Sequence, residues 1–260
     1  EYSLPEKKKE TPCISLGMDG AMMLMRNDGY RETMVGTIAL YNSEGERQYS
    51  IYVAGSPEYG KGKFIKNFEK EIKNIKSIYP DATYIGIADG AHTNWKFLEN
   101  KTNMQITDFY HATEYLAKYS KAIFAKNQEN KRKDWIDAAC HELKHTHGAV
   151  DALLKEFELS LNNKKLSSVK KEVISSIITY FTNQKSRMQY AQYRASNLPI
   201  GSGITEAACK TIVKHRLCSS GMRWKDKGAS VVLKLRCLDK SNRWELFWNK
   251  IDQYPLPKLN

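Results

Sequence analysis

The chain has 260 residues, and its 41% hydrophobic residues and five tryptophans favour a folded protein over a disordered tail. It contains no run of about 18 apolar residues, which excludes a membrane-spanning helix. The net charge of +12 is uneven, because residues 1–111 contain 14 Lys/Arg and 15 Asp/Glu whereas residues 112–260 contain 27 and 14. A neutral first part and a basic second part predict a polyanionic partner along the C-terminal half, since a uniformly lysine-rich composition would spread the charge evenly.

The first part of the chain alternates apolar and polar residues as β-strands do. Strands are predicted over residues 13–25, 32–41 and 48–54. Turn-forming residues at 27–29 and 42–45 separate these strands. The polar, lysine-rich start before them has neither an initiator Met nor an apolar signal core, so we expect the chain to be an internal piece of a longer protein.

A helix is predicted next, because apolar residues recur three and four positions apart from Phe64 to Ile78 and Pro80 follows. The short apolar run 83–88 is typical of a strand buried on both faces. A helix around 93–100 and a strand over 104–109 complete the order β-β-β-α-β-α-β. We therefore expect an α/β fold with a mixed five-stranded sheet flanked by helices.

The periodicity is helical almost throughout residues 112–194. Residues 198–203 form a loop rich in helix breakers, and a helix that carries Glu206 follows it. A second loop, 219–228, precedes two final helices, in which Trp244 and Trp248 are expected to be core residues. Two apolar stripes mark the helical stretch: Trp135, Ile136, Ala139 and Leu143 in one, and Val169, Val173, Ile174, Ile177, Ile178 and Phe181 in the other.

Three acidic residues stand in or at the ends of predicted strands. Asp19 interrupts the first strand, Asp89 ends the run 83–88, and Asp108 lies at the end of the next strand. Asp19 and Asp89 are each followed by glycine, and a single Asp-Gly pair is more often a turn than a site. Several buried carboxylates together repel one another unless a cation binds them, and Mg²⁺ and Mn²⁺ prefer such oxygen ligands.

Taken together, these segments resemble the RNase H-like DDE transposases, which place one Asp on the first strand, one after the fourth and a Glu on a later helix. The ISKra-type insertion-sequence transposases of the Mutator-like group are the most similar. The resemblance covers nearly the whole chain, from Asp19 to Trp248. It rests on Met18-Asp19-Gly20, Ala88-Asp89-Gly90-Ala91, Asp108-Phe109-Tyr110-His111-Ala112, Leu198-Pro199-Ile200-Gly201-Ser202-Gly203, Glu206-Ala207-Ala208-Cys209-Lys210, Ser220-Gly221-Met222-Arg223-Trp224, Arg243-Trp244 and Phe247-Trp248.

The resemblance implies that Asp19, Asp89 and Glu206 bind two Mg²⁺ or Mn²⁺ ions and catalyse DNA cleavage and strand transfer at transposon ends. Asp108 and His111 would form an accessory Asp-x-x-His motif, with His111 either orienting DNA or capping the next helix. Asp108 is also the rival of Asp89 as the second catalytic Asp.

The resemblance also implies a domain organisation and a partner. Residues 11–111 would be the sheet part of an RNase H-like core, 112–197 an all-helical insertion, and 198–252 the C-terminal helices of the core. Double-stranded DNA, as transposon end and target, would be the partner of a homodimer or larger assembly. We expect a cytoplasmic, nucleoid-associated location, because the five cysteines are scattered and form no C-x-x-C pair.

Basic residues near Glu206 are candidates for DNA contact. Lys210 and Lys214 follow Glu206 by one and two helical turns and would neutralise phosphate, although a plain ion pair on a solvated helix is the alternative. Arg223, Trp224 and Lys225 join cations to an aromatic ring in a loop, which suits backbone contact and base stacking.

Other functions fit parts of the sequence. His141 and His145 satisfy the H-E-x-x-H pattern of zinc metalloproteases, but the apolar stripe of that helix leaves them facing solvent. The segment 55–62 lacks the Ser/Thr of a P-loop, and Cys209, His215 and Cys218 match no usual zinc spacing. A transposase-derived DNA-binding protein that has lost catalysis is the main alternative.

Overall fold

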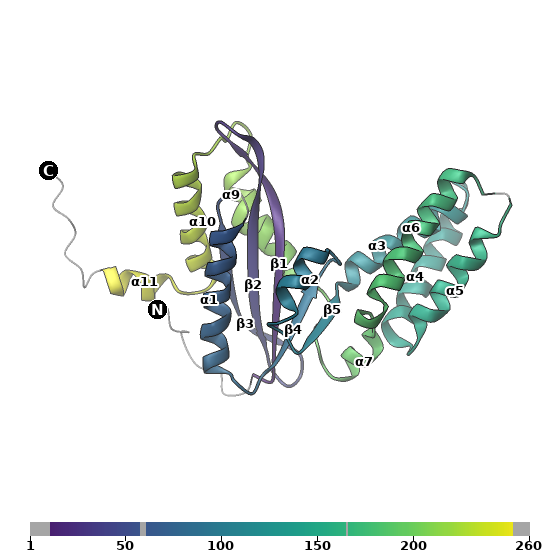
Figure 1. Ribbon diagram of the computed structural model, residues 1–260, viewed down its shortest axis with the longest axis horizontal. Coiled ribbons are helices and arrows are strands. Elements are labelled where there is room, and N and C mark those ends of the chain that lie inside the picture. The colour runs from purple at the N-terminus through teal and green to yellow at the C-terminus, as the bar shows by residue number, and fades with distance from the viewer. Residues whose placement is uncertain (1–10, 58–60, 165, 252–260) are drawn as a thin grey trace. The chain divides into compact units, whose positions relative to one another are not determined.

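The computed structural model describes residues 11–57, 61–164 and 166–251. Its five strands form one mixed sheet in the order β3-β2-β1-β4-β5, and helices accompany the sheet, so the chain has an α/β fold (Figure 1). This confirms the predicted order β-β-β-α-β-α-β, whereas the segment 1–10 lies outside the described residues. The strands are β1 (Cys13–Met25), β2 (Gly29–Tyr41), β3 (Arg47–Gly55), β4 (Thr83–Ala88) and β5 (Met104–Thr107).

The chain divides into two compact units. The first unit combines the chain up to Tyr84 with the chain from Gly203 onward, and the second unit is Ile85–Ser202. The division falls inside β4, so β5 and most of β4 belong with the helical segment rather than with the first three strands. The predicted domain boundaries, after residues 111 and 197, were drawn from motifs and stay a prediction.

In the first unit, β1 and β2 form a long antiparallel hairpin, with β3 antiparallel to β2 (Figure 1). Helix α1 (Gly62–Ile78) buries Phe64 and Phe68. The ring of Phe68 approaches Gly36 of β2 so closely that a Cβ there would lie 2.9 Å from it, so the close packing of helix and strand requires glycine.

The C-terminal part of the first unit is helical. Its helices pack on β1, β2 and β3 through a shared apolar cluster that includes Met23, Val35, Ile212 and Leu233. The loop before α10 is shorter than predicted, because the helix begins at Asp226. The helices are α8 (Gly203–Ala208), the π-helical segment η2 (Cys209–Lys214), α9 (His215–Leu217), α10 (Asp226–Lys240) and α11 (Trp244–Ile251).

The expectation that Trp244 and Trp248 are core residues is wrong. Their exposed fractions are 39% and 43%. The four-residue spacing brings the two indoles into edge-to-face contact, with their ring centroids 5.6 Å apart. The spacing therefore predicted correctly that the two residues lie on the same side of α11, but it did not predict that they are exposed.

In the second unit, β4 and β5 pair in parallel, and a helical bundle follows them. Tyr119, Phe157 and Phe181 fill the bundle core, and Val169 of the predicted stripe is instead 66% exposed. In the described residues no helix combines the length and apolar character that crossing a membrane demands. The helices are α2 (His92–Leu98), α3 (Phe109–Ile123), α4 (Glu129–His145), α5 (Ala149–Leu161), α6 (Ser168–Gln184), the short η1 (Lys185–Arg187) and α7 (Tyr190–Ala195).

Candidate functional site

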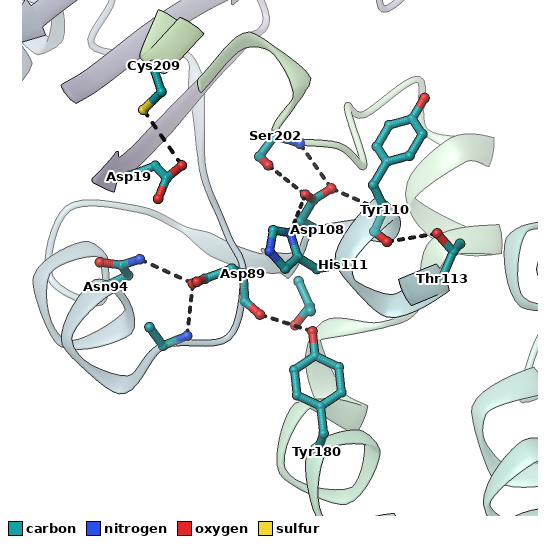
Figure 2. Close-up of polar contacts among 12 residues, drawn as sticks. Asp19, Asp89, Asn94, Asp108, Tyr110, His111, Thr113, Tyr180, Ser202 and Cys209 are labelled. Carbon is teal, nitrogen blue, oxygen red and sulfur yellow. Dashed lines mark hydrogen bonds and ion pairs between the residues drawn. The ribbon is translucent and has the colours of Figure 1, made fainter. Parts of the chain in front are cut away.

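Asp19 lies inside β1, opposite Val35 of β2, with a half-buried side chain. Its Oδ1 accepts a 2.7 Å hydrogen bond from the backbone N–H of Gly20. Its Oδ2 accepts from the thiol of Cys209 at 3.7 Å, within the usual range for a sulfur donor (Figure 2). The carboxylate thus has one donor on each oxygen and forms no ion pair among the described residues of the first unit.

The pKa of the Cys209 thiol responds to the charges around it. Burial raises its pKa to about 12, and the negative charge of Asp19 and, more weakly, that of Glu206 act in the same direction. The thiol is therefore protonated at neutral pH and serves as a donor, not as a nucleophile. The positive charge of Lys214 opposes them, so the thiol lies in the field of charges from β1 and from the helical segment that begins at Gly203.

Helix α8 is fixed to the sheet one residue before Glu206. The hydroxyls of Thr205 and Thr37 form a 2.7 Å hydrogen bond between α8 and β2, and both side chains are buried. The hydroxyl of Thr37 also lies 3.4 Å from the carbonyl of Gly17 on β1. A buried hydroxyl pair of this kind sets the register of a helix on a sheet, so the half-buried Glu206 has a defined position beside β1 and β2.

The helix that carries Glu206 continues as the π-helical segment η2. Arg236 of α10 donates to the carbonyls of Ile212 and Thr211, which satisfies carbonyls of the widened turn. π-Helical turns are rare and occur mostly at functional sites. Lys210 and Lys214 lie in η2 and are exposed. The prediction that they share a helix face with Glu206 assumes 3.6 residues per turn, and a π-helical segment does not have this period.

Of the predicted DNA-contacting loop, Arg223 and Lys225 are exposed and Trp224 is half-buried. The backbone of Trp224 pairs with the end of β1 through Leu24 and Arg26. Its indole N–H donates to the carbonyl of Leu217 at 2.9 Å, and the ring packs on the apolar cluster. These contacts give Trp224 a structural role, and its contact with DNA stays a prediction.

Asp89 follows the buried end of β4 in the second unit and is half-buried. Its Oδ1 accepts from the N–H of Ala91 at 3.0 Å and from Nδ2 of Asn94 at 3.2 Å (Figure 2). Its carbonyl accepts from the hydroxyl of Tyr180. The following Gly90 has φ +111°, and a Cβ there would lie 3.0 Å from the ring of Tyr180, so a side chain at this position is excluded.

Asp108 has a different environment, because it is fully buried and caps α3. Its Oδ1 accepts from the N–H groups of Tyr110 (3.1 Å) and Ser202 (3.2 Å). Its Oδ2 accepts from the hydroxyl of Ser202 (2.6 Å) and lies 3.1 Å from Nδ1 of His111 (Figure 2). Burial alone would raise the pKa of Asp108, but the hydrogen bonds from His111 and Ser202 outweigh it, and the pKa is lowered.

His111 is the charged partner of Asp108. The hydrogen bond to Asp108 raises the pKa of His111 to about 9, although partial burial opposes this. The imidazole is therefore a cation at neutral pH, held by Nδ1 with about a third of the side chain exposed. Asp108 and His111 belong to the types of ligand that can hold a metal ion, as a buried carboxylate and an imidazole.

Several contributors to these sites were not identified from the sequence. Ser202 was assigned only to a breaker loop, and its donors reach Asp108 from 94 positions away. Tyr180, Asn94 and Cys209 likewise gave no signal for their contacts with acidic residues. No local pattern could have shown these partners, because each pairing except Asn94 with Asp89 depends on the tertiary fold.

The metalloprotease alternative finds little support. His141 and His145 are exposed on α4, as predicted, and their rings stack at 4.5 Å. The guanidinium of Arg194 lies 2.9 Å from Nε2 of His145, and slight desolvation together with this positive charge lowers the pKa of His145. Within residues 11–57, 61–164 and 166–251, neither histidine belongs to a group of three possible metal ligands.

The two remaining alternatives are not supported either. The P-loop-like segment 55–62 lies partly outside the described residues, because 58–60 are not described. Cys209 and Cys218 donate to Asp19 and to the carbonyl of Met22, and in the described part of the chain they form no three-ligand group with His215. All five cysteines are free thiols.

Comparison with models of known protein families and with curated protein sequences gives no match.

Proposed function

We propose that the chain is the catalytic core of a DDE transposase with an RNase H-like fold, which cleaves and joins DNA at transposon ends using Asp19, Asp89 and Glu206. The observation that carries the proposal is the pair of half-buried carboxylates in the first unit. The charges of both, opposed by that of Lys214, act on the thiol of Cys209, and within the described part of that unit neither forms an ion pair with Lys, Arg or His. Carboxylates without such a partner can bind a divalent cation.

The donor set fits Mg²⁺ or Mn²⁺, because carboxylate oxygens are the ligands that these hard ions prefer. Two bound ions would supply the activation of water or a 3′-hydroxyl and the stabilisation of the leaving oxygen in an in-line displacement at phosphorus. The proposal requires Asp89 of the second unit to act with the two carboxylates of the first unit. The Thr37–Thr205 bond would hold Glu206 in place, and the protonated Cys209 would orient Asp19.

The hydrogen bonds favour Asp89 over Asp108 as the second catalytic Asp. Within the described residues of the second unit, Oδ2 of Asp89 receives no hydrogen bond, whereas both oxygens of Asp108 receive two. We therefore assign Asp108 a positioning role. It keeps His111 protonated, and the free Nε2–H of His111 would donate to a DNA phosphate.

Basic residues would supply the DNA contacts that the net charge suggests. Lys210, Lys214, Arg223 and Lys225 are all exposed on the first unit. Ion contacts with phosphate give affinity without sequence specificity, so these residues would hold the DNA and not select the transposon end. We further propose that a homodimer or larger assembly acts on the two ends.

Plasmid nicking tests the proposal without knowledge of the transposon ends. Supercoiled DNA is incubated with the protein and Mg²⁺ or Mn²⁺, and Asp19→Asn, Asp89→Asn and Glu206→Gln are compared with the wild type. Each variant should lose about a hundredfold to a thousandfold in rate, because a group that stabilises the transition state is removed. Asp81→Asn, the same change at an exposed turn residue, is the control.

Full metal-dependent nicking by one of the three variants would show that the residue concerned is not catalytic. The alternative, a DNA-binding protein that has lost catalysis, is favoured by the basic second part of the chain. It predicts DNA affinity that falls with salt, ignores Mg²⁺ and is accompanied by no nicking in any sample.

A further inference from the structure

A groove in the first unit lies between α1 and α10, both of which pack against β3 (Figure 1). Its volume is about 340 Å³, at the lower end of the range of small-molecule sites. The polar face of α1 lines one side and a face of α10 lines the other. The lining residues of the helices are Asn67, Lys70, Glu71 and Asn74 from α1, and Lys234, Cys237, Leu238 and Ser241 from α10 and its C-cap.

The floor of the groove is the edge strand β3, whose outward N–H groups already have partners. The N–H of Tyr52 donates to Oγ of Ser241 at 3.0 Å. The N–H of Ala54 forms a hydrogen bond with the thiol of Cys237. Because α10 and its C-cap satisfy these two backbone groups, this part of the edge strand is not available to pair with an added β-strand.

A buried arginine is the unusual feature of the groove. Arg243 is only 4% exposed and forms an ion pair with Glu71, with Nη1 3.0 Å from Oε1. Its Nε–H has no hydrogen-bond acceptor among the described residues. Arg243 therefore adds a buried positive charge to the lining of the groove and fixes the position of Glu71.

The groove is also positively charged. Three cations, Lys70, Lys234 and Arg243, face a single carboxylate, that of Glu71. Because Glu71 is already paired with Arg243, the charges of the two exposed lysines are left without a counter-ion among the described residues. This composition selects an anion that has several acceptor oxygens.

We propose that the groove binds a phosphate ester of about mononucleotide size. Lys70 and Lys234 hold the phosphate oxygens, and the buried Arg243 adds positive charge to the lining behind them. The inference does not rest on the proposed nuclease site, since it involves neither Asp19 nor Glu206 and needs no divalent metal.

Calorimetric titration of the full chain with inorganic phosphate and with AMP, at constant ionic strength and without divalent metal, tests this inference. Saturable binding is expected. The double variant Lys70→Ala/Lys234→Ala should bind at least about tenfold more weakly, because two charge-assisted contacts are lost. Lys73→Ala/Lys240→Ala, which removes two exposed lysines of the same helices outside the groove, should bind as the wild type does.

Ligand binding is separated from folding by the unfolding temperature of Lys70→Ala/Lys234→Ala. Both lysines are exposed, so this temperature should stay near that of the wild type while AMP binds more weakly. A parallel titration with a DNA duplex distinguishes two sources of phosphate. Tighter binding of AMP than of the duplex indicates a free phosphate ester. Tighter binding of the duplex, weakened in Lys70→Ala/Lys234→Ala, indicates the DNA backbone. Absence of binding to all three probes, or binding that Lys70→Ala/Lys234→Ala does not weaken, would overturn the proposal.

Discussion

Asp108 in the second unit and Asp19 in the first unit are both acidic residues of the sheet region, but their surroundings differ. Asp108 is fully buried and receives hydrogen bonds from four donors, one of them a protonated histidine. Asp19 is half-buried and receives one bond from its neighbouring N–H and one from a thiol. The protein thus stabilises Asp108 through four donors and Asp19 through two.

The comparison separates two functions of an acidic residue. A fully buried carboxylate with two donors on each oxygen contributes to stability, and its loss leaves buried donors without acceptors. A half-buried carboxylate with only two donors in all contributes less. Asp89 is similar to Asp19 in this respect, because its side chain accepts two hydrogen bonds, both at Oδ1, within the described part of its unit.

The largest expected effect on stability comes from Asp108. Asp108→Ala should lower the free energy of unfolding by about 3 kcal/mol, because it leaves the buried donors of Ser202 and Tyr110 without an acceptor. Asp89→Ala should cost about 1 kcal/mol or less. Urea denaturation followed by circular dichroism measures both, and equal losses for the two variants would contradict the distinction.

The threonine pair that fixes α8 should show the next largest effect. Thr37→Val or Thr205→Val alone should cost about 1–3 kcal/mol, because each leaves a buried hydroxyl without its partner. The double variant should cost less than the sum of the two, which a double-mutant cycle in urea detects. Strict additivity would show that the hydroxyls do not interact.

The ion pair of His111 with Asp108 makes the stability of the protein depend on pH. Its pKa of about 9 lies above the ordinary 6.5, so its stabilising charge is fully present below pH 6.5 and is lost as the pH rises through about 9. The pKa of Asp108 is lowered, so its contribution is present above 3.8 and is lost as the pH falls through the folded-state value. NMR titration of the metal-free protein measures the His111 pKa.

In Asp108→Asn the pKa of His111 should fall toward 6.5, because the main cause of its elevation is removed. A pKa near 9 in this variant would mean that other groups hold the proton on His111.

The smallest expected effect concerns DNA affinity. Lys210→Ala and Lys214→Ala should each reduce the slope of log affinity against log salt by about 1, since each lysine would neutralise one phosphate. Lys131→Ala, at an exposed position of α4, is the matched control. Slopes equal to that of the wild type would place the DNA elsewhere on the protein.

The sequence predicted the elements well where the signal is local. The strands β1 and β4 begin and end at the predicted residues, because alternation and continuous apolar runs report directly on burial. The burial of Trp244 and Trp248 was predicted wrongly, since their spacing also suits two indoles in edge-to-face contact. The carbonyls of the π-helical segment η2 accept hydrogen bonds from Arg236, 24 residues beyond Ile212, and no helical period reveals this contact.

The candidate site was predicted in part. Asp19, Asp89 and Glu206 could be chosen from strand ends and motifs, but the sequence left Asp89 and Asp108 as rivals. The difference between them lies in the donors of Ser202, which reach Asp108 only in the folded chain. Long-range hydrogen bonds decide which acidic residue is saturated, and a sequence pattern does not contain them.

Mn²⁺ binding to the metal-free protein, followed by electron paramagnetic resonance, tests the central claim most directly. The account predicts two bound ions in the wild type, in Asp81→Asn and in Asp108→Asn, and fewer in Asp19→Asn, Asp89→Asn and Glu206→Gln. Loss of the ions in Asp108→Asn together with full binding in Asp89→Asn would contradict it, because Asp108 would then be the ligand and Asp89 the turn residue.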